Sequence, residues 1–214
     1  SDIDLTDKGR AGAVKAGEIM KGAGVNFDEV HTSKLNRAIE TAQLAQKGMS
    51  AQWVPLQKFW RLNERCYGDL EGKKREDVAK EVGDDQVKIW RRSFDVPPPS
   101  LAVTDARSPV KDPRYADLDP RVIPASESLK DVIARVGPYW TDQLRPAIKS
   151  GKTVLVVGHS TNLRALSAWI EPNLDEKTLQ KLEIKNTKPI LYEFDKNMNV
   201  ICRKVLEPST VKKE

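Results

Sequence analysis

The chain has 214 residues and a formal net charge of +5, with 39% of its residues hydrophobic and 31% charged. This length suits one domain with a sizeable core, and this composition excludes a disordered or a fibrous protein. The longest purely apolar run, Val154 to Val157, is far too short to cross a bilayer, so we expect no membrane partner.

The chain contains only two cysteines and two histidines. Cys66 and Cys202 show neither a CxxC motif nor metal-ligand spacing, which argues against a disulfide framework and predicts no metal site. Any histidine chemistry must therefore use His31 or His159. The excess of basic residues suits anionic ligands, but no basic stripe with interleaved aromatic residues marks a nucleic-acid-binding protein.

The first part of the chain predicts helix, strand, helix and strand. Thr6 is expected to cap the first helix, and residues 27–31 predict a short strand. Ser33 is expected to cap a second helix that ends just before Gly48. Residues 52–56 predict a second strand. This alternation is typical of an α/β fold.

The middle of the chain is polar and rich in proline. Residues 73–93 predict one or two helices interrupted by a glycine. Residues 95–125 hold most of the prolines and show no periodicity, so they predict a long insertion loop, either functional or mobile. A long helix is expected over 126–149, and Pro138 and Pro146 should kink or break it.

The last part completes the α/β pattern. Residues 153–157 predict a central strand that is covered on both faces. Helical patterns follow at 162–171 and 175–184, and residues 190–206 predict two strands joined by a turn. We therefore expect residues 1–214 to form one three-layer α/β/α domain with a mainly parallel sheet.

The segment after the central strand, Val157-Gly158-His159-Ser160-Thr161-Asn162, carries the strongest functional signal. Ligands of such sheets bind at the carboxyl ends of the strands, and the next helix offers free N–H groups to an anion. His159 could donate to a phosphate or take part in phosphoryl transfer, or it could merely satisfy a turn. The segment also approaches the GxSxG nucleophile elbow, but no histidine follows Ser160, which excludes a hydrolase triad.

Three further segments carry charged residues that suit an anion. A predicted loop places Glu64 near Tyr67 with an arginine between them, which suits a general acid among anion donors or a solvated loop. Arg91 and Arg92 end a polar helix, where they could clamp a carboxylate or phosphate or only complement the helix dipole. Arg37, in the first turns of the second helix, is another possible anion contact.

Taken together, these segments resemble the cofactor-dependent phosphoglycerate mutases, a branch of the histidine phosphatase superfamily. They follow the family order to about Phe194, and the Trp-Arg-Arg segment with the insertion after it is specific to the mutases. The matching segments are Leu5-Thr6-Asp7-Lys8-Gly9, Thr32-Ser33-x-Leu35-x-Arg37-Ala38-Ile39-x-Thr41, Leu62-Asn63-Glu64-Arg65-x-Tyr67-Gly68-x-Leu70-x-Gly72, Gln86-Val87-Lys88-x-Trp90-Arg91-Arg92, Glu127-Ser128-Leu129, Arg135-Val136-x-Pro138-Tyr139-Trp140, and His159 with Leu163-Arg164-Ala165-Leu166.

The resemblance implies interconversion of 3-phosphoglycerate and 2-phosphoglycerate through a phosphohistidine, with 2,3-bisphosphoglycerate as phosphoryl donor. It implies that Glu64 exchanges the proton of the substrate hydroxyl, while His159 and Arg37 hold the transferring phosphoryl group. The substrate-binding residues that it implies are Tyr67, Arg75, Arg91, Arg92, Ser160 and Thr161. It also implies a cytoplasmic glycolytic enzyme that acts on a small phosphorylated three-carbon acid and can self-associate.

Two features depart from the family pattern. The family's nucleophile lies in an Arg-His-Gly motif after a first strand, and neither His31 nor His159 matches it, so we expect the sequence to be N-terminally incomplete and inactive alone. The family's His-Gly-Asn-Ser reads His-Ser-Thr-Asn here, which puts a side chain in place of a glycine beside the phosphate. Two alternatives stay open: a mutase-fold pseudoenzyme that serves as a binding or assembly subunit, and a phosphatase of the same superfamily.

Overall fold

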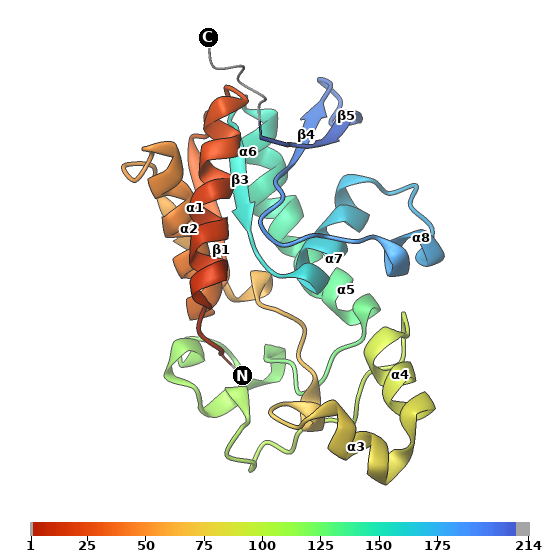
Figure 1. Cartoon of the computed structure of the whole chain (residues 1–214). Helices are drawn as coiled ribbons and strands as arrows, with labels where there is room; N and C mark the ends of the chain where they lie inside the picture. The colour runs from red at the N-terminus through yellow and green to blue at the C-terminus, as the bar shows by residue number, and fades with distance from the viewer. Residues whose placement is uncertain (1, 209–214) are drawn as a thin grey trace.

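The computed structural model describes residues 2–208 (Figure 1). Its helices and strands alternate along the first half of the chain and again near its end. In chain order they are α1 (Asp7–Gly22), β1 (Glu29–Thr32), α2 (Asn36–Met49), β2 (Leu56–Lys58), α3 (Arg75–Val82), α4 (Asp84–Arg92), α5 (Leu129–Tyr139), α6 (Arg145–Lys149), β3 (Val154–Val157), α7 (Ser160–Ile170), α8 (Glu176–Lys181), β4 (Ile190–Phe194) and β5 (Val200–Val205).

The main sheet is parallel and has β1 at its centre, in the order β2-β1-β3. Val30 of β1 pairs with Leu56 on one side and with Leu155 on the other. β4 and β5 form a separate antiparallel hairpin. Within residues 2–208, β3 and β4 each have one edge without a strand partner.

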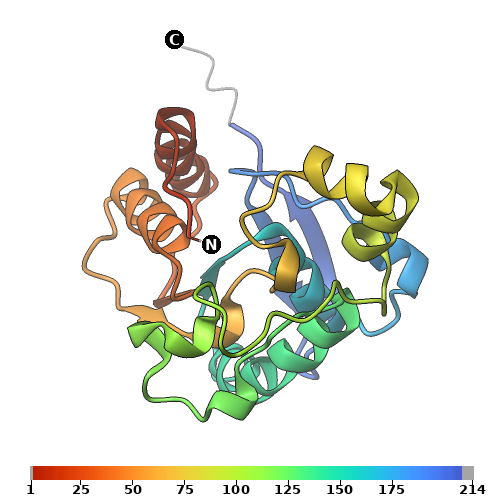
Figure 2. The same cartoon turned by 90° about the horizontal axis from the view of Figure 1, so that it is seen from below.

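Two apolar clusters lie on opposite faces of the strands. Val154 and Val156 of β3 pack against the cluster that includes residues of α5 and α7, whereas Leu155 packs against the cluster that includes residues of α1 and α2. In β4, Phe194 packs on the first cluster and Leu191 on the second. Figures 1 and 2 show α1 and α2 side by side, apart from α5 and α7. The predicted three-layer α/β fold with a parallel sheet is confirmed, and its organisation as one domain over residues 1–214 stays a prediction.

Two glycines let α1 and α2 pack closely. A Cβ atom on Gly17 would lie 2.1 Å from the carbonyl oxygen of Ala45, and one on Gly48 would lie 2.2 Å from the carbonyl oxygen of Val14. Glycines that lower helix propensity are therefore needed at this contact. The prediction that the second helix ends before Gly48 is wrong, because α2 continues to Met49 and packs the glycine against α1.

Other boundaries follow the prolines. The second strand begins at Leu56, directly after Pro55, whose carbonyl accepts from Val30 N–H at 2.9 Å. α5 continues through Pro138, but a π-helical turn over Trp140–Leu144 follows at once and leads into α6. The long predicted helix is thus irregular after its first proline, as expected for a missing backbone donor.

The proline-rich loop is held by local turns and by contacts with the rest of the molecule. It contains three short 3-10 turns, Pro109–Lys111, Pro113–Tyr115 and Pro120–Val122. Asp112 and Asp119 cap the second and third of these turns with their side chains. The loop therefore has defined structure over part of its length.

Candidate active site

His159 lies directly before α7, at the carboxyl end of β3. Its side chain is buried, and its Nε2 lies 2.9 Å from Ser33 Oγ. Ser33 Oγ also accepts from Leu35 N–H at 3.1 Å. The prediction that Ser33 caps the second helix is therefore wrong: α2 starts at Asn36 with Leu35 at its cap position, and the Ser33 hydroxyl faces His159 instead.

The surroundings of His159 keep its imidazole neutral. Burial lowers its pKa to about 3, and the positive charges of Arg37 and Arg135 contribute to this shift. Arg37, in the first turn of α2, thus lies close enough to act on the His159 ring electrostatically, and its guanidinium is also 3.5 Å from Asp2 Oδ1. A neutral imidazole with a guanidinium nearby suits a site for a phosphoryl group.

His31 belongs to a buried network inside the sheet. Its Nδ1 lies 2.6 Å from the Tyr139 hydroxyl, and its Nε2 lies 3.1 Å from Glu29 Oε1. The other Glu29 oxygen accepts from Lys152 Nζ at 2.9 Å. Burial lowers the pKa of His31. Both ring nitrogens have partners, so His31 links β1 to α5 and has the features of a structural histidine.

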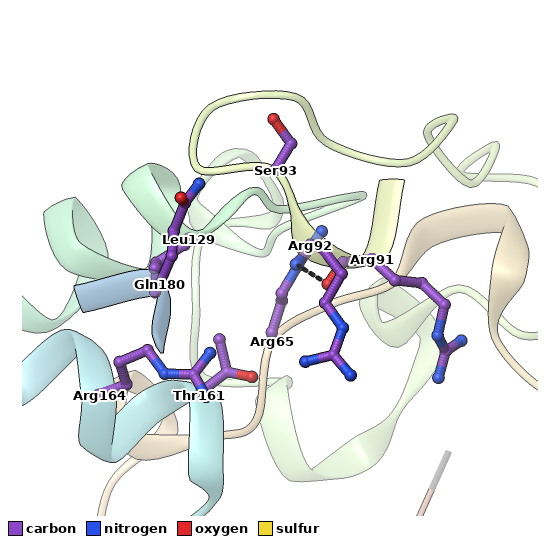
Figure 3. Close-up of a pocket in the computed structure, with 8 residues that line it drawn as sticks. All are labelled: Arg65, Arg91, Arg92, Ser93, Leu129, Thr161, Arg164 and Gln180. Atoms are coloured by element: carbon purple, nitrogen blue, oxygen red, sulfur yellow. Dashed lines mark hydrogen bonds between the residues drawn. The ribbon is translucent and has the colours of Figure 1, made fainter. Parts of the chain in front are cut away.

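A recess rich in arginine opens beside the first turn of α7 (Figure 3). Its cavity volume is about 20 Å³, within about 300 Å³ of space that includes open solvent. Its lining contains four arginines and no acidic residue: Arg65, Arg91, Arg92, Ser93, Leu129, Thr161, Arg164 and Gln180. Such a lining attracts an anion with several negatively charged oxygens.

Arg65 aligns the parts of this recess. Its side chain is almost fully buried, and it donates to the carbonyl oxygens of Trp90 at 2.6 Å and of Glu127 at 2.5 Å. The first bond satisfies a carbonyl group that the C-terminus of α4 leaves free. Arg65 therefore fixes the helix end that carries Arg91 and Arg92. The sequence patterns do not single out Arg65 as a site residue. Its position between Glu64 and Tyr67 is the signal that could have identified it.

A buried ion pair holds the loop that carries Glu64. Arg135 Nε donates to Glu127 Oε1 at 2.6 Å, and Arg135 also donates to the carbonyl of Asn63 at 3.1 Å. Glu127 Oε2 accepts from Cys66 N–H at 2.9 Å. The backbone on both sides of Glu64 is therefore pinned, and the segment is not a loosely solvated loop.

Glu64 and Tyr67 lie near the arginines of the recess. Glu64 Oε1 accepts from Arg65 N–H at 2.7 Å. The Tyr67 ring has the Arg65 guanidinium 4.9 Å and the Arg91 guanidinium 5.1 Å from its centroid. Both Glu64 and Tyr67 also interact electrostatically with Arg164. The structure thus brings these predicted residues together on one side of the molecule.

Of the remaining predicted site residues, Thr161 lines the recess and Arg75 lies outside it. Thr161 is buried and lines the recess, and Ser160 begins α7 one residue before it. Arg75 does not line the recess: it begins α3, its side chain is 63% exposed, and its guanidinium lies 3.8 Å from Asp84 Oδ1. Its role in substrate binding stays a prediction.

Residues 2–208 lack two features that would point to a membrane or to a metal ion. In this part of the chain, no helix combines the length and the apolar character that a membrane crossing requires. The same residues contain no cluster of three or more histidine, cysteine, aspartate or glutamate side chains suited to a metal ion.

Comparison with known proteins agrees with this geometry. The profile of the histidine phosphatase superfamily (branch 1) matches residues 1–112 and 102–205. A 2,3-bisphosphoglycerate-dependent phosphoglycerate mutase from Streptococcus thermophilus is 46% identical over 201 residues, covering 94% of this chain and 87% of that protein. The protein of the same name from Streptococcus sanguinis is 45% identical over the same share of both chains.

Solved structures share the fold at lower sequence identity. A phosphoglycerate mutase from Bacillus anthracis has a TM-score of 0.59 at 24% identity, over 87% of this chain and 75% of that one. An alpha-ribazole phosphatase from Shigella flexneri has a TM-score of 0.67 at 19% identity, over 97% and 86%. Because the profile and the streptococcal relatives both span most of its length, the chain belongs to the phosphoglycerate mutase family of the histidine phosphatase superfamily.

Proposed function

We propose that this protein is a phosphoglycerate mutase that transfers a phosphoryl group between the 2- and 3-positions of glycerate. The observation that carries this proposal is the recess lined by Arg91, Arg92 and Thr161, the last of which lies two residues after His159, with no carboxylate in its lining. A small acid with a phosphate and a carboxylate matches such a set of donors. The names of the relatives at 45% and 46% identity support the same reaction.

Different residues of the site would hold the phosphoryl group, exchange the proton and bind the rest of the substrate. A phosphoryl group in transfer spreads negative charge over its oxygens, and the fixed donors His159 and Arg37 can stabilise that charge without moving. Glu64, held beside the arginines by its pinned loop, would exchange the proton of the substrate hydroxyl. Tyr67, Arg91 and other residues of the recess would hold the end of the substrate that does not react.

The donor set also fits 2,3-bisphosphoglycerate, which supplies the phosphoryl group when bound. Two phosphates and a carboxylate need several cationic donors, and the lining of the recess supplies them without a carboxylate among them. Arg91 and Arg92 would hold its distal groups, and Thr161 would contact it from α7. A pathway role in glycolysis, a cytoplasmic location and self-association stay predictions from the resemblance.

The nucleophile of the reaction would be a histidine other than the two in these 214 residues. Both ring nitrogens of His31 have partners inside the sheet, and His159 Nε2 faces Ser33. We therefore expect no phosphohistidine when the 214-residue polypeptide is incubated with labelled 2,3-bisphosphoglycerate. Acid-labile, base-stable label on this polypeptide would contradict the expectation.

Binding of 3-phosphoglycerate tests the proposed site without requiring turnover. Arg92→Gln removes one cationic donor of the recess, so we expect it to weaken binding by roughly tenfold or more in isothermal titration calorimetry. Arg121→Gln is the matched control, because Arg121 is exposed and pairs with Asp119 outside the recess. Equal affinities of Arg92→Gln and the unaltered chain would refute the assignment.

The two other hypotheses make different predictions. A phosphatase of the same superfamily would hydrolyse general phosphomonoesters at least as well as phosphoglycerates. A pseudoenzyme would bind 3-phosphoglycerate, with Ser160 and Thr161 in the family's phosphate-binding positions, but would show no transfer even with a suitable histidine present. No contact among the described residues favours either over the mutase.

A further inference from the structure

The recess contains an arginine that the mutase proposal does not use. Arg164 lies on α7, three residues after Thr161, so the two side chains share one face of the helix. Both line the recess together with Arg92 (Figure 3). We propose that Arg164 is a further substrate-binding residue, which holds with Arg92 the negatively charged end of the substrate that is not transferred. This inference rests on the proposed function.

The guanidinium of Arg164 is fixed at one nitrogen and available at the others. Its Nε donates to the carbonyl oxygen of Leu182 at 2.9 Å. Within residues 2–208, its two terminal nitrogens have no hydrogen-bond or ion-pair partner in the structure. An arginine held at Nε presents its terminal N–H groups in one plane, which suits the two oxygens of a carboxylate or phosphate.

The charges around Arg164 also favour an anion. Burial lowers the pKa of Arg164, and so does the positive charge of Arg92, while Glu64 and Tyr67 offset part of this shift. Figure 3 shows both guanidinium groups turned toward the space beside Thr161. Two cations that face one half-closed space repel each other, and an anion between them removes that repulsion.

Arg65 also lines the recess, but its side chain already binds backbone carbonyl groups. Each of its three nitrogens donates to a backbone carbonyl oxygen, at 2.5 Å to Glu127, 2.6 Å to Trp90 and 3.5 Å to Arg91. Arg92 and Arg164 therefore remain as arginine donors on the side of Thr161, whereas the Arg91 guanidinium lies over the Tyr67 ring. Leu182 directly follows α8, whose Gln180 also lines the recess. The bond from Arg164 to Leu182 thus ties the α8 segment to the site that binds the substrate.

Isothermal titration calorimetry of the 214-residue chain with 3-phosphoglycerate and with inorganic phosphate tests this role. We expect Arg164→Gln to weaken 3-phosphoglycerate binding by roughly tenfold or more, since a charge-assisted bond is lost. Arg164→Lys keeps the charge without the planar fork and should give an intermediate loss. Lys181→Gln is the control. It also removes one positive charge, but from an exposed residue of α8 that does not line the recess.

The outcomes separate this inference from the proposed function. If the unaltered chain prefers 3-phosphoglycerate to phosphate and Arg164→Gln binds it equally well, with only its melting temperature lowered, Arg164 is structural and the inference is wrong. If the chain shows no such preference but Arg164→Gln weakens phosphate binding, the anion-binding role stands and the mutase proposal fails. An unaltered chain that binds neither anion overturns both.

Discussion

At the scale of single residues, the main feature is a buried neutral histidine beside arginines. Ser33 was expected to cap a helix, and its hydroxyl instead lies 2.9 Å from His159 Nε2. Sequence patterns could not reveal this contact, because the two residues are far apart in the chain and meet only when β1 and β3 pair. The contact is nonetheless what orients the imidazole at the end of the sheet.

The lowered pKa of His159, about 3, makes the stability of the protein depend on pH. Below the ordinary histidine pKa of about 6.5, His159 binds a proton in the unfolded chain but not in the folded chain. Stability therefore falls as pH falls from about 6.5 toward 3. Between pH 7 and 5, His159 alone should reduce the free energy of unfolding by about 2 kcal/mol. Urea unfolding at both pH values measures this loss.

The matched variant is His159→Gln, which has no titrating group at this position but leaves His31 in place. We expect its loss of stability between pH 7 and 5 to be smaller than that of the unaltered chain by about the same amount. If both proteins lost the same free energy of unfolding between pH 7 and 5, the pKa of His159 would not be lowered by burial as the structure indicates.

At the scale of elements, hydropathy and capping patterns predicted most of the helices and strands in their order. Thr6 caps α1 as expected, with Gly9 N–H donating to its Oγ1 at 3.1 Å. The prediction failed at Gly48 because a glycine near a helix end looks like a terminator, whereas here it makes room for another helix. The second strand was placed too early because residues 52–54 form turns before Pro55.

Gly48→Ala tests the close packing of α1 and α2. The added Cβ would lie 2.2 Å from the carbonyl oxygen of Val14, a backbone atom that can shift only with its helix. We expect the variant to lose about 1–3 kcal/mol of stability, although alanine is the better helix former.

The control for this variant is Gly9→Ala, also in a helix. Its Cβ would lie 3.3 Å from the flexible Leu5 Cδ2 atom, so we expect little change or a small gain in stability. Thermal unfolding of the two variants compares them directly. If Gly48→Ala were as stable as Gly9→Ala, the helix packing described for α1 and α2 would be incorrect.

At the scale of the whole molecule, the recess is built from segments that are distant in sequence. The end of α4, the loop around Arg65, the first turns of α7 and the end of α8 meet around one space (Figures 1 and 3). The resemblance to the mutases supplied Arg91, Arg92 and Thr161 as candidates, but local patterns could not supply Arg164. An arginine within an amphipathic helix is usually a solvated residue, and only the folded chain shows which face it lies on.

The central claim is that the site binds a phosphorylated three-carbon acid at both ends, with the carboxylate held by arginines of the recess. Calorimetric titrations with 3-phosphoglycerate and with glycerol 3-phosphate, which lacks the carboxylate, test it most directly. We predict that 3-phosphoglycerate binds at least about tenfold more tightly, because arginine donors of the recess pair with its carboxylate. Equal affinities for the two compounds would contradict the account.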